Sequence, residues 1–292
     1  MKKAFQKIKE NFNNNFKPKF KEFLKKYLTK QAVTIIGIVA LIIALGFGGV
    51  KLYNYSRTAY LRPYIEKYNI EYPEGILKEM CDPYGKDQSV RGRLEIEDLD
   101  FSQYFSNVIK NDYAFLENDA DIEKDQHFRA IRLSEKDADL ESLYSTSELF
   151  LKSSQRIKLT TLYDKEEYRV IAAFYINTKP EDDNGYVFPY NFCGNISEKD
   201  FESYEDRITH RTLYDTGYEF SLDDYFLTLS VPSDFMEDFR FVVVCVRNDK
   251  REFTKSETAV KNEKIYFPQV WYDVNNENNP YIFAGKWHPE LI

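Results

Sequence analysis

Apolar and polar residues alternate in short runs over the second half of the chain, and this pattern predicts strands. Two runs rich in β-branched and aromatic residues, Tyr225–Ser230 and Phe239–Val246, flank a polar connection opened by Val231-Pro232-Ser233. They predict two neighbouring strands joined by a loop. The second run is apolar on both alternating faces, which predicts a strand in the middle of a sheet. The same pattern is equally typical of two core strands that carry no chemistry.

Other short runs of this kind precede the pair, and turns separate them. Helices are expected at Leu140–Lys152 and at Glu198–Ile208, where Ser197 is a suitable N-cap. Many short strands with few helices predict a mostly-β domain, a barrel or a sandwich, over residues 86–250. The other expected strands are Gly92–Ile96, His127–Leu133, Arg156–Leu162 and Tyr168–Ile176.

The N-terminal part of the chain has a different pattern. Residues 32–50 form a run of 19 residues without a charge, which is enough for a helix to cross a bilayer. We therefore predict a transmembrane helix over residues 31–51. Lysines gather before it, so the positive-inside rule places the N-terminus in the cytoplasm and the main domain outside the cell membrane, in a single-pass protein. A cleaved signal peptide is the alternative, and the long basic segment and long apolar run disfavour it.

Charge and composition also change at this segment. Residues 1–30 contain ten lysines and two glutamates, a net charge of +8, whereas the rest of the chain carries −16. Regularly spaced phenylalanines in residues 1–30 are typical of a basic amphipathic helix on the anionic inner leaflet, and a solvated basic tail is the alternative. We expect the membrane as a partner and no nucleic acid. Residues 52–85 predict a helical stalk, and residues 251–292 form an aromatic extension that either packs on the domain or binds a partner.

Cysteines and histidines are few and widely spaced. The three cysteines, Cys81, Cys193 and Cys245, form no C-x-x-C pair, so neither a zinc site nor a disulfide framework is indicated. The three histidines are equally scattered and show no metal-ligand spacing. We expect no metal and no cofactor.

Four segments share a pattern with a known family. Val90–Ile96 reads V-R-G-R-L-E-I, Asn111–Leu116 reads N-D-Y-A-F-L, Leu227–Ser230 reads L-T-L-S, and Arg240 begins the run R-F-V-V-V. These segments follow a predicted membrane anchor and stalk in the chain. Together they resemble the class B sortases, the cell-surface cysteine transpeptidases of Gram-positive bacteria. The family's segments are V-V-G-W-L-x-I, D-N-x-x-Y-L, T-L-S-T-C and R-x-V-V. Arg93 stands in place of the family's Trp. The resemblance implies a mostly-β, sortase-like closed β-barrel with a few helices.

Sortase chemistry uses a Cys thiolate that attacks a carbonyl, a His that protonates the leaving amine and an Arg that stabilises the oxyanion. The resemblance carries the Arg over to Arg240. It places the Cys at Pro232, whose ring has no nucleophile, and the His near Arg132, whose guanidinium cannot act as a general acid near neutral pH. It therefore predicts Arg240, Arg132 and Ser230 as substrate-binding residues, and no catalytic Cys or His.

No sequence feature ties one of the remaining thiols or histidines to Arg240. Cys245 follows Arg240 on the same apolar strand and is expected to be buried, as a small hydrophobe. Cys193 is expected to be an accessible thiol in a loop, without a catalytic role. His127 lies at the beginning of its expected strand, whereas the family's His follows the end.

The functional hypothesis is a membrane-anchored extracellular pseudo-sortase. Its groove binds a sorting-signal-like peptide or a carboxylate, or the domain scaffolds surface-protein or pilus assembly beside an active sortase. The alternative is an active class B sortase, a cysteine transpeptidase that anchors surface proteins to the cell wall, whose catalytic residues lie elsewhere in the sequence. A third possibility keeps only the fold and uses residues 265–292 as an interaction surface.

Overall fold

The computed structural model describes residues 17–19, 22, 39, 58–110, 112–117, 126–134, 138–249 and 252–290. The chain divides into two units, residues 1–67 and 68–292. Apart from a few isolated positions, the predicted basic segment and transmembrane helix lie outside the described residues and stay predictions. Within the described ranges, no helix has the length and apolar character to span a membrane. Helix α4 (Arg62–Tyr68) ends at the boundary between the units.

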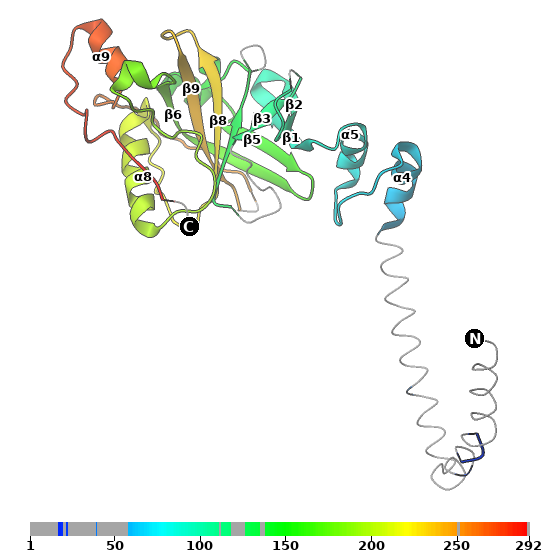
Figure 1. The fold of residues 1–292 in the computed structure, drawn as a ribbon. Helices are drawn as coiled ribbons and strands as arrows, with labels where there is room; N and C mark the ends of the chain where they lie inside the picture. Colours follow the sequence, from blue (N-terminus) through cyan, green and yellow to red (C-terminus); the bar gives the residue numbers. More distant parts are fainter. Residues whose placement is uncertain are drawn as a thin grey trace. The chain divides into compact units, whose positions relative to one another are not determined.

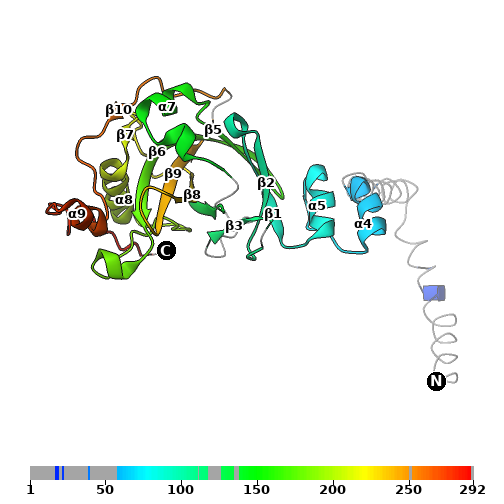
Figure 2. The same cartoon turned by 90° about the horizontal axis from the view of Figure 1, so that it is seen from above.

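A closed β-barrel forms the centre of the second unit (Figures 1 and 2). Among the described residues, its strands follow one another in the order β1-β2-β3-β4-β8-β9-β6-β5. β2 is parallel to β3 and β4 is parallel to β8, whereas the other neighbours are antiparallel. The strands are β1 (Val90–Ile96), β2 (Phe101–Ser106), β3 (Ala114–Leu116), β4 (Phe128–Arg132), β5 (Arg156–Thr161), β6 (Lys165–Asn177), β8 (Phe226–Ser233) and β9 (Phe239–Arg247). The predicted mostly-β closed barrel is confirmed.

Strand β9 lies between β8 and β6, in the middle of the sheet, as its apolar run predicts. Its two faces contribute to two different cores. Phe241, Val243 and Cys245 belong to the core inside the barrel, whereas Val242 and Val244 belong to a second core on the outer face. Burial on both faces explains why this stretch does not alternate between apolar and polar residues.

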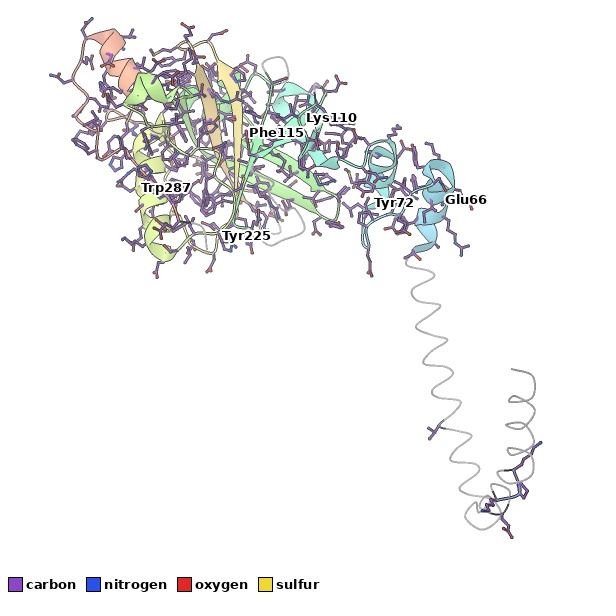
Figure 3. The ribbon with its side chains drawn as sticks, viewed as in Figure 1. Glu66, Tyr72, Lys110, Phe115, Tyr225 and Trp287 are labelled. Atoms are coloured by element: carbon purple, nitrogen blue, oxygen red, sulfur yellow. The ribbon has the colours of Figure 1, made fainter. Side chains whose placement is uncertain are left out.

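The outer core is covered by helix α8 (Glu198–Arg211) and by the C-terminal extension (Figure 2). The predicted cap is confirmed, because the Ser197 side chain accepts a hydrogen bond from the Asp200 amide. Trp287 is only 4% exposed and lies beside α8 (Figure 3). The extension therefore packs against the barrel through Trp287, which confirms the packing alternative for this residue.

The smaller helices and the second sheet differ from the sequence-based expectations. The helix expected over Leu140–Lys152 is interrupted, because Thr146 leaves the helical conformation and caps the second part. Residues 68–85 of the expected stalk belong to the second unit, where the Leu77 amide donates to the Leu162 carbonyl. The remaining elements are α5 (Cys81–Lys86), α6 (Glu141–Tyr144), α7 (Ser147–Lys152), α9 (Gln269–Asn275) and a two-stranded sheet of β7 (Tyr214–Asp215) and β10 (Val260–Lys261).

Candidate functional site

The structure brings the four sequence-predicted site residues together at one end of β4, β8 and β9. Arg132 is the register partner of Ser230, and Pro232 is the register partner of Arg240. Residues that flank these positions in the strands belong to the core inside the barrel. Because side chains alternate along a strand, Arg132, Ser230 and Arg240 point to the outer face. This group of four residues is called the outer-face site below.

Arg240 connects the strands of the outer-face site. Its Nη2 donates to the carbonyl oxygens of Ser230 at 2.8 Å and of Leu133 at 3.0 Å, and its Nε donates to Ser230 Oγ at 3.2 Å. The Leu133 amide donates to the same Ser230 carbonyl at 2.9 Å. The guanidinium therefore fixes the end of β4 against β8, and its half-buried position keeps its charge next to solvent.

Arg132 forms an ion pair with an acidic residue that the sequence analysis did not select. Its Nε lies 3.2 Å from Glu117 Oε1, without the angle of a good hydrogen bond. The Glu117 side chain is only 8% exposed, whereas that of Arg132 is 39% exposed. The Arg132 guanidinium also lies 5.0 Å from the centre of the Phe115 ring. Glu117 thus positions a cation at the surface, and no local sequence pattern marks it.

Tyr190 is a second neighbour that the sequence does not reveal. Burial raises the pKa of its phenol, the charge of Arg240 opposes this rise, and Glu117 adds to it. The charges of Arg240 and Glu117 thus both act on this phenol. Its phenol stays protonated at neutral pH and can donate a hydrogen bond to a carbonyl or carboxylate. A tyrosine in the irregular segment between β6 and α8 gives no sequence signal of this position.

Pro232 lies inside strand β8, which corrects the prediction of a loop that begins at Val231. In β8, the Phe226 amide donates to the His127 carbonyl, and the Ser230 carbonyl accepts a hydrogen bond from the Leu133 amide. The amide and carbonyl groups of the even-numbered residues of β8 therefore point toward β4. Strand β4 ends at Arg132, the register partner of Ser230, so no residue of β4 lies opposite Pro232. The missing amide hydrogen therefore faces an edge, where proline is tolerated within a sheet.

All three cysteines, Cys81 included, are buried. Cys245 is fully buried inside the barrel, as predicted, and burial raises the pKa of its thiol. The prediction of an accessible thiol at Cys193 is wrong, because Cys193 is 9% exposed and its Sγ donates to the Glu117 carbonyl at 3.4 Å. Burial raises the pKa of Cys193 to about 12. Since the thiolate is the nucleophile, burial disfavours the reactive form of Cys193.

Histidines lie away from the outer-face site. His127 precedes β4 and stacks on Tyr225 with ring centres 4.5 Å apart, whereas Arg132 is at the other end of that strand. A strand of this length spans about 16 Å. Figure 3 places Phe115, the neighbour of Arg132, and Tyr225 near opposite ends of the barrel. His210 stacks on Tyr266 and His288 packs against Tyr186, both on the side of the C-terminal extension.

An open depression borders Arg240 where β8 turns into β9. Asp238 pairs there with Lys179, whereas Asp234 and Glu237 are exposed. The depression thus combines one guanidinium with exposed carboxylates. Within the described ranges, no cluster of His, Cys, Asp or Glu side chains is suited to hold a metal ion. The lining residues are Thr178, Pro232, Ser233, Asp234, Met236, Glu237, Asp238, Phe239 and Arg240.

The barrel has the fold of the class B sortases. A Bacillus anthracis protein described as similar to sortase B is 17% identical, with a TM-score of 0.51 over 68% of this chain and 98% of that chain. Sortase B from Bacillus anthracis in complex with AAEK1 is 15% identical, with a TM-score of 0.50 over 70% and 100% of the two chains. The Staphylococcus aureus sortase B–substrate complex gives 14% identity and a TM-score of 0.50 over 69% and 97%. These identities establish the fold alone. No protein-family model and no curated protein sequence matches the chain.

Proposed function

We propose that the protein is a membrane-anchored, extracellular sortase-like protein that binds an extended peptide or a carboxylate at the outer-face site without thiol chemistry. One observation carries this proposal: Pro232, where the sortase resemblance expects the nucleophile, is the register partner of Arg240. The cation of the family's site is thus retained at a position that offers no attacking group. A protein of this kind is a pseudo-sortase, and its role is to bind.

The chemistry of the outer-face site favours a peptide over other ligands. Arg240 and Arg132 supply positive charge for a backbone carbonyl or a carboxylate, and guanidinium groups bind such oxygens in a planar, two-pronged geometry. Asp234 and Glu237 on the neighbouring depression favour a basic group farther along the same ligand. An extended peptide with a carbonyl or carboxylate for the arginines and a basic side chain a few residues away for Asp234 and Glu237 satisfies both features of the surface.

Two kinds of partner present such a segment next to a membrane. A surface protein or pilus subunit with a sorting-signal-like peptide is the first. An active sortase is the second, for which this protein acts as a scaffold during surface-protein or pilus assembly. Both place the ligand on the same face of β4, β8 and β9, so variants of the outer-face site weaken both.

Replacing the two arginines tests the proposal. We expect Arg132→Met and Arg240→Met each to weaken the binding of a fluorescently labelled sorting-signal peptide to the full-length protein by about tenfold or more, because each removes a charge-assisted contact. Fluorescence anisotropy measures the affinity. Arg156→Met, on the distant strand β5, is the matched control.

Arg240 also holds backbone carbonyls, so its variant is compared at a temperature below its own unfolding midpoint. Arg132 makes no such backbone contact among the described residues, and its variant carries the test if Arg240→Met is unstable. Equal affinities for Arg132→Met, Arg156→Met and the unaltered protein would show that the peptide does not bind at this face.

The alternative function, an active class B sortase, requires a thiol near Arg240. Cys193 is the cysteine that contacts this region, through the Glu117 carbonyl. It becomes a nucleophile only if a conformational change exposes it and lowers its pKa, since burial raises that pKa in the present structure.

A further inference from the structure

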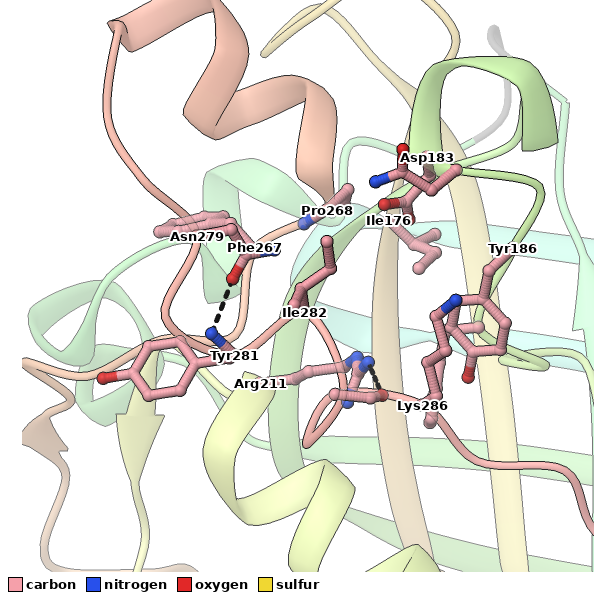
Figure 4. Close-up of a pocket in the computed structure, with 13 residues that line it drawn as sticks. Ile176, Asp183, Tyr186, Arg211, Phe267, Pro268, Asn279, Tyr281, Ile282 and Lys286 are labelled. Carbon is pink, nitrogen blue, oxygen red and sulfur yellow. Dashed lines mark hydrogen bonds between the residues drawn. The ribbon is translucent and has the colours of Figure 1, made fainter.

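A second polar cavity lies away from the outer-face site, between the end of α8 and the C-terminal extension (Figure 4). Its volume is about 30 Å³, which accommodates about two water molecules or one small polar group. Arg211 of α8 and Lys286 of the extension line it, together with Asp183 from the turn after β6. Figure 4 shows Arg211 next to Lys286 and Asp183 on the opposite side of the cavity.

Arg211 is a buried cation without a carboxylate partner. The residue is 6% exposed, and no ion pair joins its guanidinium to an acidic residue among those described. Its Nη1 donates to the Arg207 carbonyl at 3.2 Å, its Nη2 donates to the Gly285 carbonyl, and its guanidinium lies 3.9 Å from the centre of the Phe188 ring. Burial lowers the pKa of Arg211 to about 10, so the guanidinium remains charged at neutral pH.

The acidic residue in the cavity, Asp183, forms no ion pair with Arg211 among the described residues. Asp183 Oδ1 accepts a hydrogen bond from the Gln269 amide at 2.7 Å, and burial raises the pKa of its carboxyl. Lys286 adds a second positive charge, and its ammonium lies over the Tyr186 ring without an ion pair among the described residues. Two cations and one carboxylate leave the cavity with a net positive charge, and because Arg211 is buried this excess favours the entry of an anion.

The backbone keeps the cavity open next to the guanidinium. A side chain at Gly285 would place its Cβ 3.3 Å from Arg211 Nη2 and 3.2 Å from the Tyr281 carbonyl oxygen. A glycine at this position lets the chain pass close to Arg211 without filling the space beside it. The extension therefore provides both a cation and room next to the buried guanidinium.

We propose that this cavity binds a small oxyanion, a carboxylate or a phosphate group, between Arg211 and Lys286. Arg211 offers planar donors that match two oxygens of such a group, and Lys286 offers a point charge. The bound anion joins α8 to the C-terminal extension, so binding stabilises the folded protein. The cavity is separate from the outer-face site, so anion binding here does not depend on the proposed function.

Thermal unfolding of the full-length protein in sodium acetate, sodium phosphate or sodium chloride of equal ionic strength tests the inference. We expect acetate or phosphate to raise the unfolding midpoint above that in chloride, in proportion to the logarithm of its concentration. The more effective of the two anions identifies the ligand class. Equal midpoints in the three salts would overturn the inference, because they would reflect screening alone.

Variants assign the effect to the cavity. We expect Lys286→Met to weaken the affinity for the effective anion by about tenfold, and Arg211→Met to abolish binding. Lys264→Met, at an exposed lysine that does not line the cavity, is the control and keeps full affinity. If Arg211→Met does not fold, Lys286→Met decides the question. An unchanged anion affinity in Lys286→Met would place the binding elsewhere and overturn the inference.

Discussion

We expect Glu166→Ala to lower the free energy of unfolding by about 3–5 kcal/mol, because it leaves a buried arginine without its counter-charge. Arg129 Nη1 lies 2.9 Å and 3.2 Å from the two carboxylate oxygens of Glu166. Their side chains are 7% and 11% exposed. Tyr168 donates a hydrogen bond to the same carboxylate at 2.8 Å, and Arg247 lies 3.9 Å away. Urea unfolding followed by circular dichroism measures the change.

Glu167→Ala is the matched control for this variant. Glu167 is the next residue on β6, faces the other way and is 40% exposed, with Arg156 at 4.0 Å. Exposed pairs of this kind contribute about 0–1 kcal/mol. The double variant Arg129→Met/Glu166→Met removes both charges, and we expect it to be more stable than Glu166→Ala alone. Similar losses for Glu166→Ala and Glu167→Ala would contradict the buried network.

We expect Trp287→Ala to have the second large effect and to lower the free energy of unfolding, again by about 3–5 kcal/mol. Its indole packs against Phe188, Phe192 and Tyr204, with ring centres 5.4–5.9 Å apart. The Trp287 backbone exchanges two hydrogen bonds with the Tyr186 hydroxyl. Removal of the ring therefore opens a cavity in the outer core while the backbone contacts remain.

Phe283→Ala provides the comparison within the same extension, because Phe283 is 84% exposed. We expect this change to alter the free energy of unfolding by less than about 0.5 kcal/mol. Equal effects of the two variants in the same denaturation experiment would mean that the extension only rests on the surface. The expected difference instead makes the extension part of the folded domain.

Several elements of the fold are predictable from the sequence for physical reasons. The run of valines in β9 requires a strand buried on both faces, and the pattern from Ser197 onward requires a capped helix. Strand β2 gives no such signal, because its polar residues include the exposed Ser102, the half-buried Gln103 and the buried Ser106 and so follow no single face. Its pairing with β1 is a tertiary contact that local periodicity does not encode.

The outer-face site is predictable only in part. Strand spacing and the family resemblance lead to Arg240, Ser230, Arg132 and Pro232, and the register of β4, β8 and β9 places these residues together. The burial of Cys193 depends on the path of a loop over β4, which a single sequence does not specify. The contact between Glu117 and Arg132 also depends on tertiary structure, because it requires the antiparallel register of β3 and β4, in which Phe115 is the partner of Arg132.

The central claim is that the outer-face site binds a peptide and does not cleave it. The most direct measurement is mass spectrometry of a sorting-signal peptide after incubation with the full-length protein and an amine nucleophile. We predict that the peptide is recovered intact, with no covalent adduct on Cys193 or the other cysteines. Cleavage of the peptide with transfer to the amine, abolished by Cys193→Ala, would contradict this account and establish an active transpeptidase.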